Sequence, residues 1–303
     1  MKKKFSNISK ISALVVMIIS VVFTFSAYAV SGDQSKASAS LMMDPDTMAK
    51  VVAPMAVVTL AMVAWHAAKM LGWKPALRMV GSGLAIAYVL EEIGVHTGII
   101  FGRYYFNPIM GPKLDVIPIA VFCGWVTLTY IAWVVTNLLI DGSPTPTRHS
   151  TPLIILRAVV GALVVATFDL NYDPIAVENG WWVWLDGGSY FGVPIHNYVG
   201  WFFVAFVTYL AHGYQLRRLQ APSLDSASVG VRKLSIAPLV LYGLSGIAFM
   251  FMNFAGQLGL ISFYAFGIPF IVATWKWIEW YKRTSKVPTS ETTKSSLGDD
   301  LNS

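Results

Sequence analysis

Charged side chains are scarce in this chain of 303 residues. They make up 13% of it, whereas hydrophobic residues make up 55% and the mean hydropathy is +0.59. A soluble domain averages about a quarter charged residues, so this composition excludes an ordinary soluble protein. The apolar stretches are continuous and do not alternate with polar residues, which argues against a membrane β-barrel. The chain is therefore predicted to be an all-α, polytopic integral membrane helical bundle.

Cysteine, clustered histidine and nucleotide-binding motifs are also missing. The single cysteine, Cys123, excludes an intrachain disulfide and a zinc site made of thiolates. The five histidines show neither HxxH nor HxxxH spacing, so no metal site is predicted. No GxGxxG or Walker sequence occurs, which leaves a nucleotide cofactor without support. Any chemistry would then depend on acids and aromatic side chains, with no cofactor.

Eight apolar segments of membrane-spanning length are predicted. They are residues 11–29, 51–71, 80–100, 116–140, 153–172, 193–213, 235–256 and 258–280. With the amino terminus in the cytoplasm, 18 of the 22 Lys and Arg residues fall on the cytoplasmic side, as the positive-inside rule requires. Because the basic residues are sorted in this way, the net charge of +6 does not predict nucleic-acid binding. A multi-pass protein of the cell inner (plasma) membrane is expected.

The two ends of the chain differ from this membrane domain. Residues 1–30 have a Lys-rich start, an apolar core and an Ala-Tyr-Ala sequence, so they are either a cleaved signal peptide or the first transmembrane helix. Cleavage would leave seven spans. Residues 31–50 are predicted to be a polar linker, residues 51–284 the transmembrane catalytic domain, and residues 285–303 a disordered cytoplasmic tail.

Glu91 and Glu92 lie near the middle of the predicted span 80–100. An ionisable side chain at bilayer depth costs ~2.5–3.5 kcal/mol, so it usually belongs to a functional interior. Glycines follow Glu91 at steps of three or four, at positions 94, 98 and 102, and such spacing lets another helix approach closely. Glu91 is therefore predicted to face the protein interior, either as a catalytic group or as a structural hydrogen-bond acceptor.

Local ion pairs are predicted around the loop that follows the predicted span 80–100. Glu92 and His96 are spaced as an i,i+4 pair on the adjoining helix face. Arg103 and Lys113 are the basic residues nearest the outer acids, and one or both are expected to pair with Asp115 or Asp173. Tyr104 and Tyr105 either line a substrate pocket or belong to an aromatic belt at the membrane interface.

A second polar block spans residues 169–201. Asp169 and Asp173 share a helical face, and Pro174 is expected to end regular hydrogen bonding there. Trp181, Trp184 and Tyr190 crowd a short loop, either as interface anchors or as walls of an apolar pocket. Asn197 and Trp201 share a face of the next span, and an Asn so deep needs a hydrogen-bond partner.

Acids and aromatic side chains in a membrane suit one type of chemistry. A carboxylic acid desolvated among apolar groups keeps its proton and can act as a general acid toward a substrate in the lipid. Aromatic faces stabilise a developing carbocation by ~2 kcal/mol or more when desolvated. Protonation of an isoprenoid double bond followed by capture with water is thus chemically consistent with this sequence.

A set of motifs in residues 80–205 adds a resemblance. In chain order they are EEIGVHTGIIFGRYYF, MGPKL, VIP, DLNYDP, GWWVW, YFGVP and NYVGW. Together they resemble the membrane-integral carotenoid 1,2-hydratase family, which includes bisanhydrobacterioruberin hydratases and γ-carotene 1′-hydratases. The sequence departs from the family pattern at Asp115 and Phe106, which bears on the shape of the pocket.

The resemblance implies that water is added across the terminal 1,2 double bond of an acyclic carotenoid end, without a cofactor or metal. It places the family's functional residues on Glu91, Asp169, Asp173 and Asn197. Glu91 or Asp169 is then the expected proton donor, and Asp173 and Asn197 are expected to order water. The expected substrate-binding residues are Tyr104, Tyr105, Trp181, Trp184, Tyr190 and Trp201. The carotenoid in the bilayer and other enzymes of its pathway are the expected partners.

Two functions of other classes remain open on the sequence. A non-enzymatic carotenoid or lipid-binding protein, or a carrier, would keep an apolar pocket without needing intramembrane acids. A retinal photoreceptor would need a lysine midway along the last helix, whereas Lys276 lies near its basic end.

Overall fold

The computed structural model describes residue 17 and residues 45–219, 224–252 and 258–286. The predicted first segment 11–29 falls outside the described residues except for Met17, and most of the predicted tail does too. The predicted linker 31–50 needs one correction. The first long helix begins within it, at Pro45.

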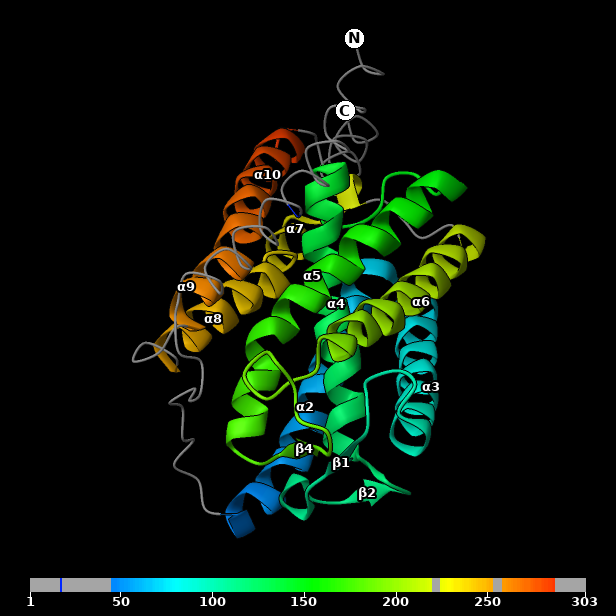
Figure 1. Ribbon diagram of the computed structural model, residues 1–303. Helices are drawn as coiled ribbons and strands as arrows, with labels where there is room; N and C mark the ends of the chain where they lie inside the picture. Colours follow the sequence, from blue (N-terminus) through cyan, green and yellow to red (C-terminus); the bar gives the residue numbers. More distant parts are fainter. Residues whose placement is uncertain (1–16, 18–44, 220–223, 253–257, 287–303) are drawn as a thin grey trace, which may run out of the picture.

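The described part of the chain is an all-α bundle, as predicted (Figure 1). Its helices are α2 (Pro45–Leu71), α3 (Trp73–Thr97), α4 (Ile119–Asp141), α5 (Thr151–Glu178), α6 (Ile195–Leu219), α7 (Val229–Leu234), α8 (Ala237–Met252), α9 (Leu258–Ser262) and α10 (Ile268–Thr284). A π-helical turn, η3 (Phe263–Gly267), joins α9 to α10, and short 3-10 turns form η1 (Pro108–Met110) and η2 (Leu224–Ser226).

Five stretches are long and apolar enough to cross a membrane, which is typical of a multi-pass membrane protein. They are Lys50–Leu71, Ile119–Asp141, Thr151–Glu178, Val229–Phe251 and Gly259–Thr284. The predicted spans 80–100 and 193–213 form α3 and α6, which are less apolar than these five. Both helices carry several polar side chains, and among these Glu91 and Asn197 are buried in the bundle.

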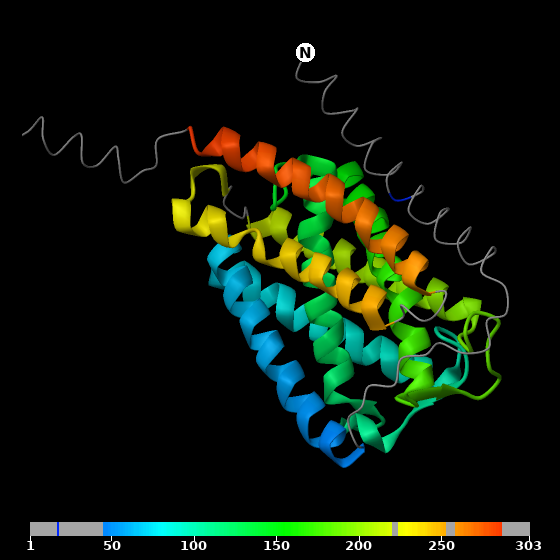
Figure 2. The same cartoon turned by 90° about the vertical axis from the view of Figure 1, so that its left-hand side faces the viewer.

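Helix α4 is the centre of the bundle (Figures 1 and 2). It packs against α2, α3, α5, α8 and α10, and its side chains are buried along most of its length. A helix that is apolar on all sides is expected in such a position. Around it, α5 and α6 pack tightly because Gly161 accommodates the ring of Tyr209 and Gly213 accommodates Ile154.

One end of the bundle is closed by two small antiparallel sheets (bottom of Figure 1). Strand β1 (Tyr104–Phe106) pairs with β4 (Trp182–Trp184), and β2 (Lys113–Leu114) pairs with β3 (Ile117–Pro118). The β1–β4 pair brings together the two polar blocks of the sequence. Gly200 allows α6 to touch the turn after α3, because a Cβ there would lie 2.2 Å from the carbonyl oxygen of Ile100.

The prediction that regular hydrogen bonding ends at Pro174 is wrong. Helix α5 continues through Pro174 to Glu178. Proline has no N–H to donate to the carbonyl four residues earlier, which belongs to Leu170. The hydroxyl of Tyr190 donates to that carbonyl instead, at 2.9 Å. A side chain from the following loop thus satisfies the carbonyl that the proline leaves without its helical partner.

The predicted pairs of Arg103 and Lys113 are also wrong. Arg103 forms a double hydrogen bond with the carboxylate of Asp186, and the ammonium of Lys113 donates to the carbonyl of Phe106 at 2.7 Å. The hydrogen bond from Arg103 lowers the pKa of Asp186 below its ordinary value. This exposed ion pair links the two segments that carry β1 and β4. The backbone N–H of Leu185 also donates a hydrogen bond to the carbonyl of Arg103 there.

Candidate functional site

A cavity of about 330 Å³ lies inside the bundle, next to the β1–β4 sheet. Its wall is mostly apolar and rich in aromatic side chains. The aromatic members are Phe101, Tyr104, Phe106, Trp125, Phe168, Tyr172, Trp182, Trp184 and Trp201. The carboxyl groups in the wall are those of Glu91 and Asp173, and Asn197 lies with them. Among the described residues, no Lys, Arg or His contributes to this lining.

Glu91 comes from the last part of α3 and is buried. Its carboxylate accepts two hydrogen bonds, from the Tyr104 hydroxyl at 2.5 Å and from the Trp125 indole nitrogen at 2.6 Å. Burial raises the pKa of Tyr104 well above its ordinary value, so this hydroxyl keeps its proton and acts as a donor. Two donors aimed at one carboxyl group favour its ionised form.

Asp169, Asp173 and Asn197 form a second buried group, between α5 and α6. The side-chain amide of Asn197 donates to Asp169 Oδ2 at 2.9 Å and also to Asp173 Oδ2. The predictions that the aspartates share a face and that Asn197 has a buried partner are therefore confirmed. Asp173 borders the cavity, whereas Asp169 is fully buried and does not belong to the cavity lining.

The two aspartates have two hydrogen-bond donors between them, whereas Glu91 alone has two. They share the single Asn197 nitrogen, and the Trp182 indole is a further donor beside Asp173. Asp169 Oδ1 is enclosed and makes no hydrogen bond with the described residues. Two adjacent buried carboxylates repel each other, so such a pair favours holding a proton between its members.

Aromatic rings are held in place on several sides of these acids. The ring centroids of Trp125 and Trp201 lie 4.2 Å apart with the planes tilted by 33°, and those of Tyr104 and Trp184 lie 5.7 Å apart. The indole of Trp184 donates to the carbonyl of Phe101 at 2.9 Å, which fixes the orientation of its ring. Tyr104, Trp184 and Trp201 thus line the cavity, at positions where the sequence predicted substrate contacts.

The other predicted substrate-binding residues lie outside this lining. Tyr105 follows Tyr104 in β1, so strand alternation turns it outward, and it is 46% exposed. Trp181 packs against Tyr172 and Trp182, which themselves border the cavity. Tyr190 is fully buried and supports α5 through the carbonyl of Leu170.

Comparison with known protein families identifies the family of this chain. Residues 50–274 match the family described as carotenoid biosynthesis protein. The chain belongs to this family. The match runs from within α2 to the first part of α10 and so includes every side chain that lines the cavity.

One relative within carotenoid biosynthesis carries a more specific name. The chain is 29% identical over 116 residues to the bisanhydrobacterioruberin hydratase of Haloarcula japonica. That alignment covers 38% of this chain and 37% of the relative, so the chain spans little more than a third of the hydratase's length. No solved structure matches this chain. The resemblance seen in the sequence motifs is therefore confirmed at the level of the family.

Several side chains of the cavity wall were not predicted from the sequence. Trp125 donates to Glu91 and packs against Trp201, and Phe101, Phe106 and Tyr172 also line the cavity. The sequence does indicate a buried role for Trp125, because this residue lies inside an apolar span and not at its end. A buried indole N–H there requires an acceptor, and interface anchoring does not explain it.

The cavity can be filled from Gly124 on α4. This glycine borders the cavity, and a Cβ added to it would have no atom within 4 Å. We expect Gly124→Leu to insert its side chain into the cavity and to abolish carotenoid binding or turnover while the protein still accumulates in membranes. Gly81→Leu is the matched control, since Gly81 is also helical with open space around it but does not border the cavity. Equal pigment conversion by both variants would show that this cavity does not hold the substrate.

Proposed function

We propose that this protein is a membrane-integral hydratase that adds water across the terminal 1,2 double bond of an acyclic carotenoid end group. The observation that carries the proposal is the cavity, with its aromatic wall, its carboxyl groups and no cationic side chain in the described lining. Aromatic faces and carboxylates both stabilise positive charge, whereas a nearby Lys or Arg would oppose it. Family membership and the distant hydratase relative support the same substrate class.

Asp173 is the proposed proton donor. It borders the cavity, and its partner Asp169 shares the Asn197 amide with it from behind. A proton held by this pair can be delivered to C2 of the terminal double bond, which leaves positive charge on the tertiary carbon C1. Asp169, which the sequence resemblance made a candidate donor, would then be a positioning residue that acts through Asp173 and Asn197.

Glu91 is the proposed counter-charge and base. Its two donors, Tyr104 and Trp125, favour the ionised form of this carboxyl group in the cavity wall. That negative charge would stabilise the C1 cation together with the surrounding rings. When water attacks C1, Glu91 would accept the proton that the water loses, which completes the tertiary alcohol. The proton taken from the aspartate pair is restored from Glu91 or from solvent, so the cycle is redox-neutral.

The substrate would enter from the lipid. Part of the cavity lining comes from Val52, Ala56 and Thr59 on α2 and from Ser245 on α8. The neighbouring residues Met55, Val58 and Leu244 are exposed, as side chains that face lipid would be. A carotenoid end could thus occupy the cavity while the rest of its polyene chain stays in the bilayer.

The alternative functions have weaker support. A carotenoid carrier would have no use for the buried carboxyl groups beside the pocket. A retinal protein needs a lysine in its pocket, but Lys276 is not part of the lining and donates to the carbonyl of Leu139 at 2.5 Å.

Isotopic labelling tests the reaction. Membranes with this protein are supplied with an acyclic carotenoid such as lycopene, and the product is analysed by mass. In H2(18)O the hydroxyl oxygen should be labelled, and in D2O one deuterium should appear at C2. Turnover should continue without O2, because the oxygen of hydration comes from water. Oxygen incorporated from O2 would refute a hydratase, and unchanged carotenoid that stays bound would favour the carrier.

A further inference from the structure

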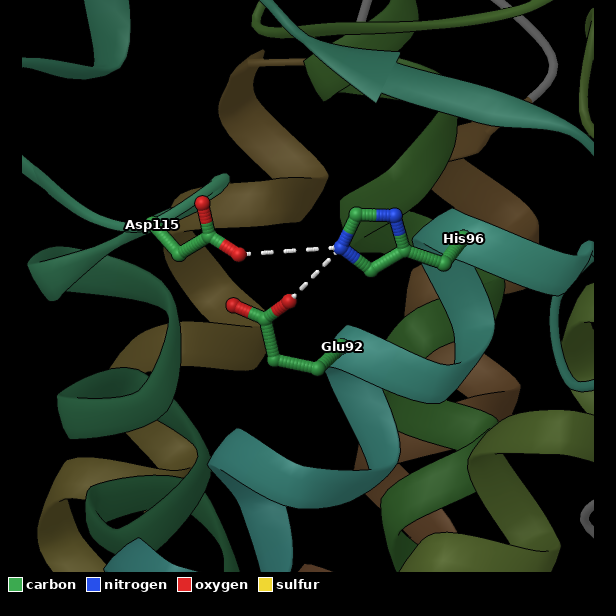
Figure 3. Close-up of side chains that lie close together, drawn as sticks. All are labelled: Glu92, His96 and Asp115. Carbon is green, nitrogen blue, oxygen red and sulfur yellow. Dashed lines mark ion pairs between the residues drawn. The ribbon is translucent and has the colours of Figure 1, made fainter.

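A second polar cluster lies at the end of α3, outside the carotenoid cavity. Figure 3 shows Glu92 and His96 from α3 and Asp115 from the turn between β2 and β3, with their polar atoms pointing toward one another. The predicted i,i+4 pair of Glu92 and His96 is confirmed at 3.1 Å. Asp115 was not predicted to join it, because a search by histidine spacing does not detect a ligand supplied by a later loop.

The geometry of the cluster is that of three ligand atoms around one point. His96 Nε2 lies 3.1 Å from Glu92 Oε2 and 3.7 Å from Asp115 Oδ2, and the three ligand atoms all lie within 4.8 Å of one another. A single proton on Nε2 can be donated to only one carboxylate, and 3.7 Å is too long for a hydrogen bond. The second carboxylate charge is therefore not compensated by that proton.

The spacing of these atoms and their access to solvent favour a cation at this point. The atoms around a tetrahedral zinc ion, with bonds of about 2.0–2.1 Å, lie roughly 3.3 Å apart, and the distances of 3.1 and 3.7 Å bracket this spacing. His96 and Asp115 are 57% and 64% exposed, so solvent can supply the remaining ligand and the ion can enter directly.

We propose that Glu92, His96 and Asp115 bind a divalent transition-metal ion of the zinc class. One imidazole and two carboxylates are ligands that Zn²⁺ accepts, whereas Mg²⁺ and Ca²⁺ prefer oxygen ligands alone. The ion would tie the end of α3 to the β2–β3 hairpin and so hold the intervening loop, which carries Tyr104. It would be a structural site that lies outside the cavity and takes no part in the chemical steps of the proposed hydration.

The test uses the untagged full-length protein, purified in detergent and freed of metal with a chelator. Binding of Zn²⁺ is measured by competition with a fluorescent chelator, and Co²⁺ absorption reports on the ligands. We expect one ion per chain in the wild type. Removing a direct ligand costs no less than the roughly 10–100-fold typical of outer ligands, so His96→Ala and Asp115→Asn should bind at least about 10-fold more weakly.

His196→Ala is the matched control, because His196 is also an exposed histidine but does not belong to the cluster. It should retain the wild-type affinity. The thermal transition should rise with Zn²⁺ in the wild type and in His196→Ala but not in His96→Ala. Equal Zn²⁺ affinity in the wild type and His96→Ala, or no binding by the wild type, would overturn the proposal and leave an ion-pair cluster. Neither result would affect the isotopic test of hydration.

Discussion

Asp173→Asn is expected to reduce carotenoid hydration by at least about 100-fold, the lower range of general acid catalysis. The substitution keeps the shape of the side chain and removes the only carboxyl group of the aspartate pair that borders the cavity. The amide that it introduces could donate to Asp169 Oδ1, which makes no hydrogen bond with the described residues, so folding should be preserved. Conversion of lycopene in membranes, normalised to the amount of protein, measures the effect.

Controls for this prediction come from acids outside the cavity. Glu178→Gln, on the exposed end of α5, and Asp186→Asn, in the exposed pair with Arg103, should change conversion little. Asp169→Asn should also lower the rate, because Asp169 shares the Asn197 amide with Asp173. Wild-type conversion by Asp173→Asn would exclude Asp173 as the donor and return that role to Glu91.

The sequence predicted that the two aspartates share a helical face and that Asn197 has a partner, because both follow from local rules, but it did not predict that the aspartates are that partner. Asp169 and Asp173 are four residues apart on one helix, so they share a face wherever the helix packs. A buried Asn also needs a partner in any fold. Both predictions are confirmed by the bonds from Asn197.

The sequence could not show which acid reaches the cavity or what surrounds it. The register Tyr104↔Trp184 and the pair of Arg103 with Asp186 join segments about 80 residues apart, and no local pattern encodes such contacts. The continuation of α5 through Pro174 could not be predicted for the same reason. The hydroxyl that replaces the missing donor to the helix, that of Tyr190, comes from the next loop. The Glu92, His96 and Asp115 cluster likewise depends on how a later hairpin folds back on α3.

Glu91→Gln is expected to abolish net hydration while the aspartate pair still transfers protons. The amide can accept from Trp125 and donate to the Tyr104 oxygen, so both hydrogen-bond partners of Glu91 keep a contact. What is lost is the negative charge that would stabilise the C1 cation and accept a proton from water. Removing a general base and a counter-charge should reduce product formation by at least about 100-fold.

Deuterium exchange separates this loss from the loss caused by Asp173→Asn. In D2O, a cation formed by protonation at C2 but not captured by water can lose H from C2 and return to the alkene carrying deuterium. Recovered substrate from Glu91→Gln should therefore contain deuterium at C2, whereas substrate from Asp173→Asn should contain none. If only substrate from Asp173→Asn contained deuterium, Glu91 would be the proton donor and Asp173 the base. The geometry favours the first pattern, because Glu91 already holds two hydrogen-bond donors, whereas Asp169 Oδ1 in the aspartate pair has none among the described residues.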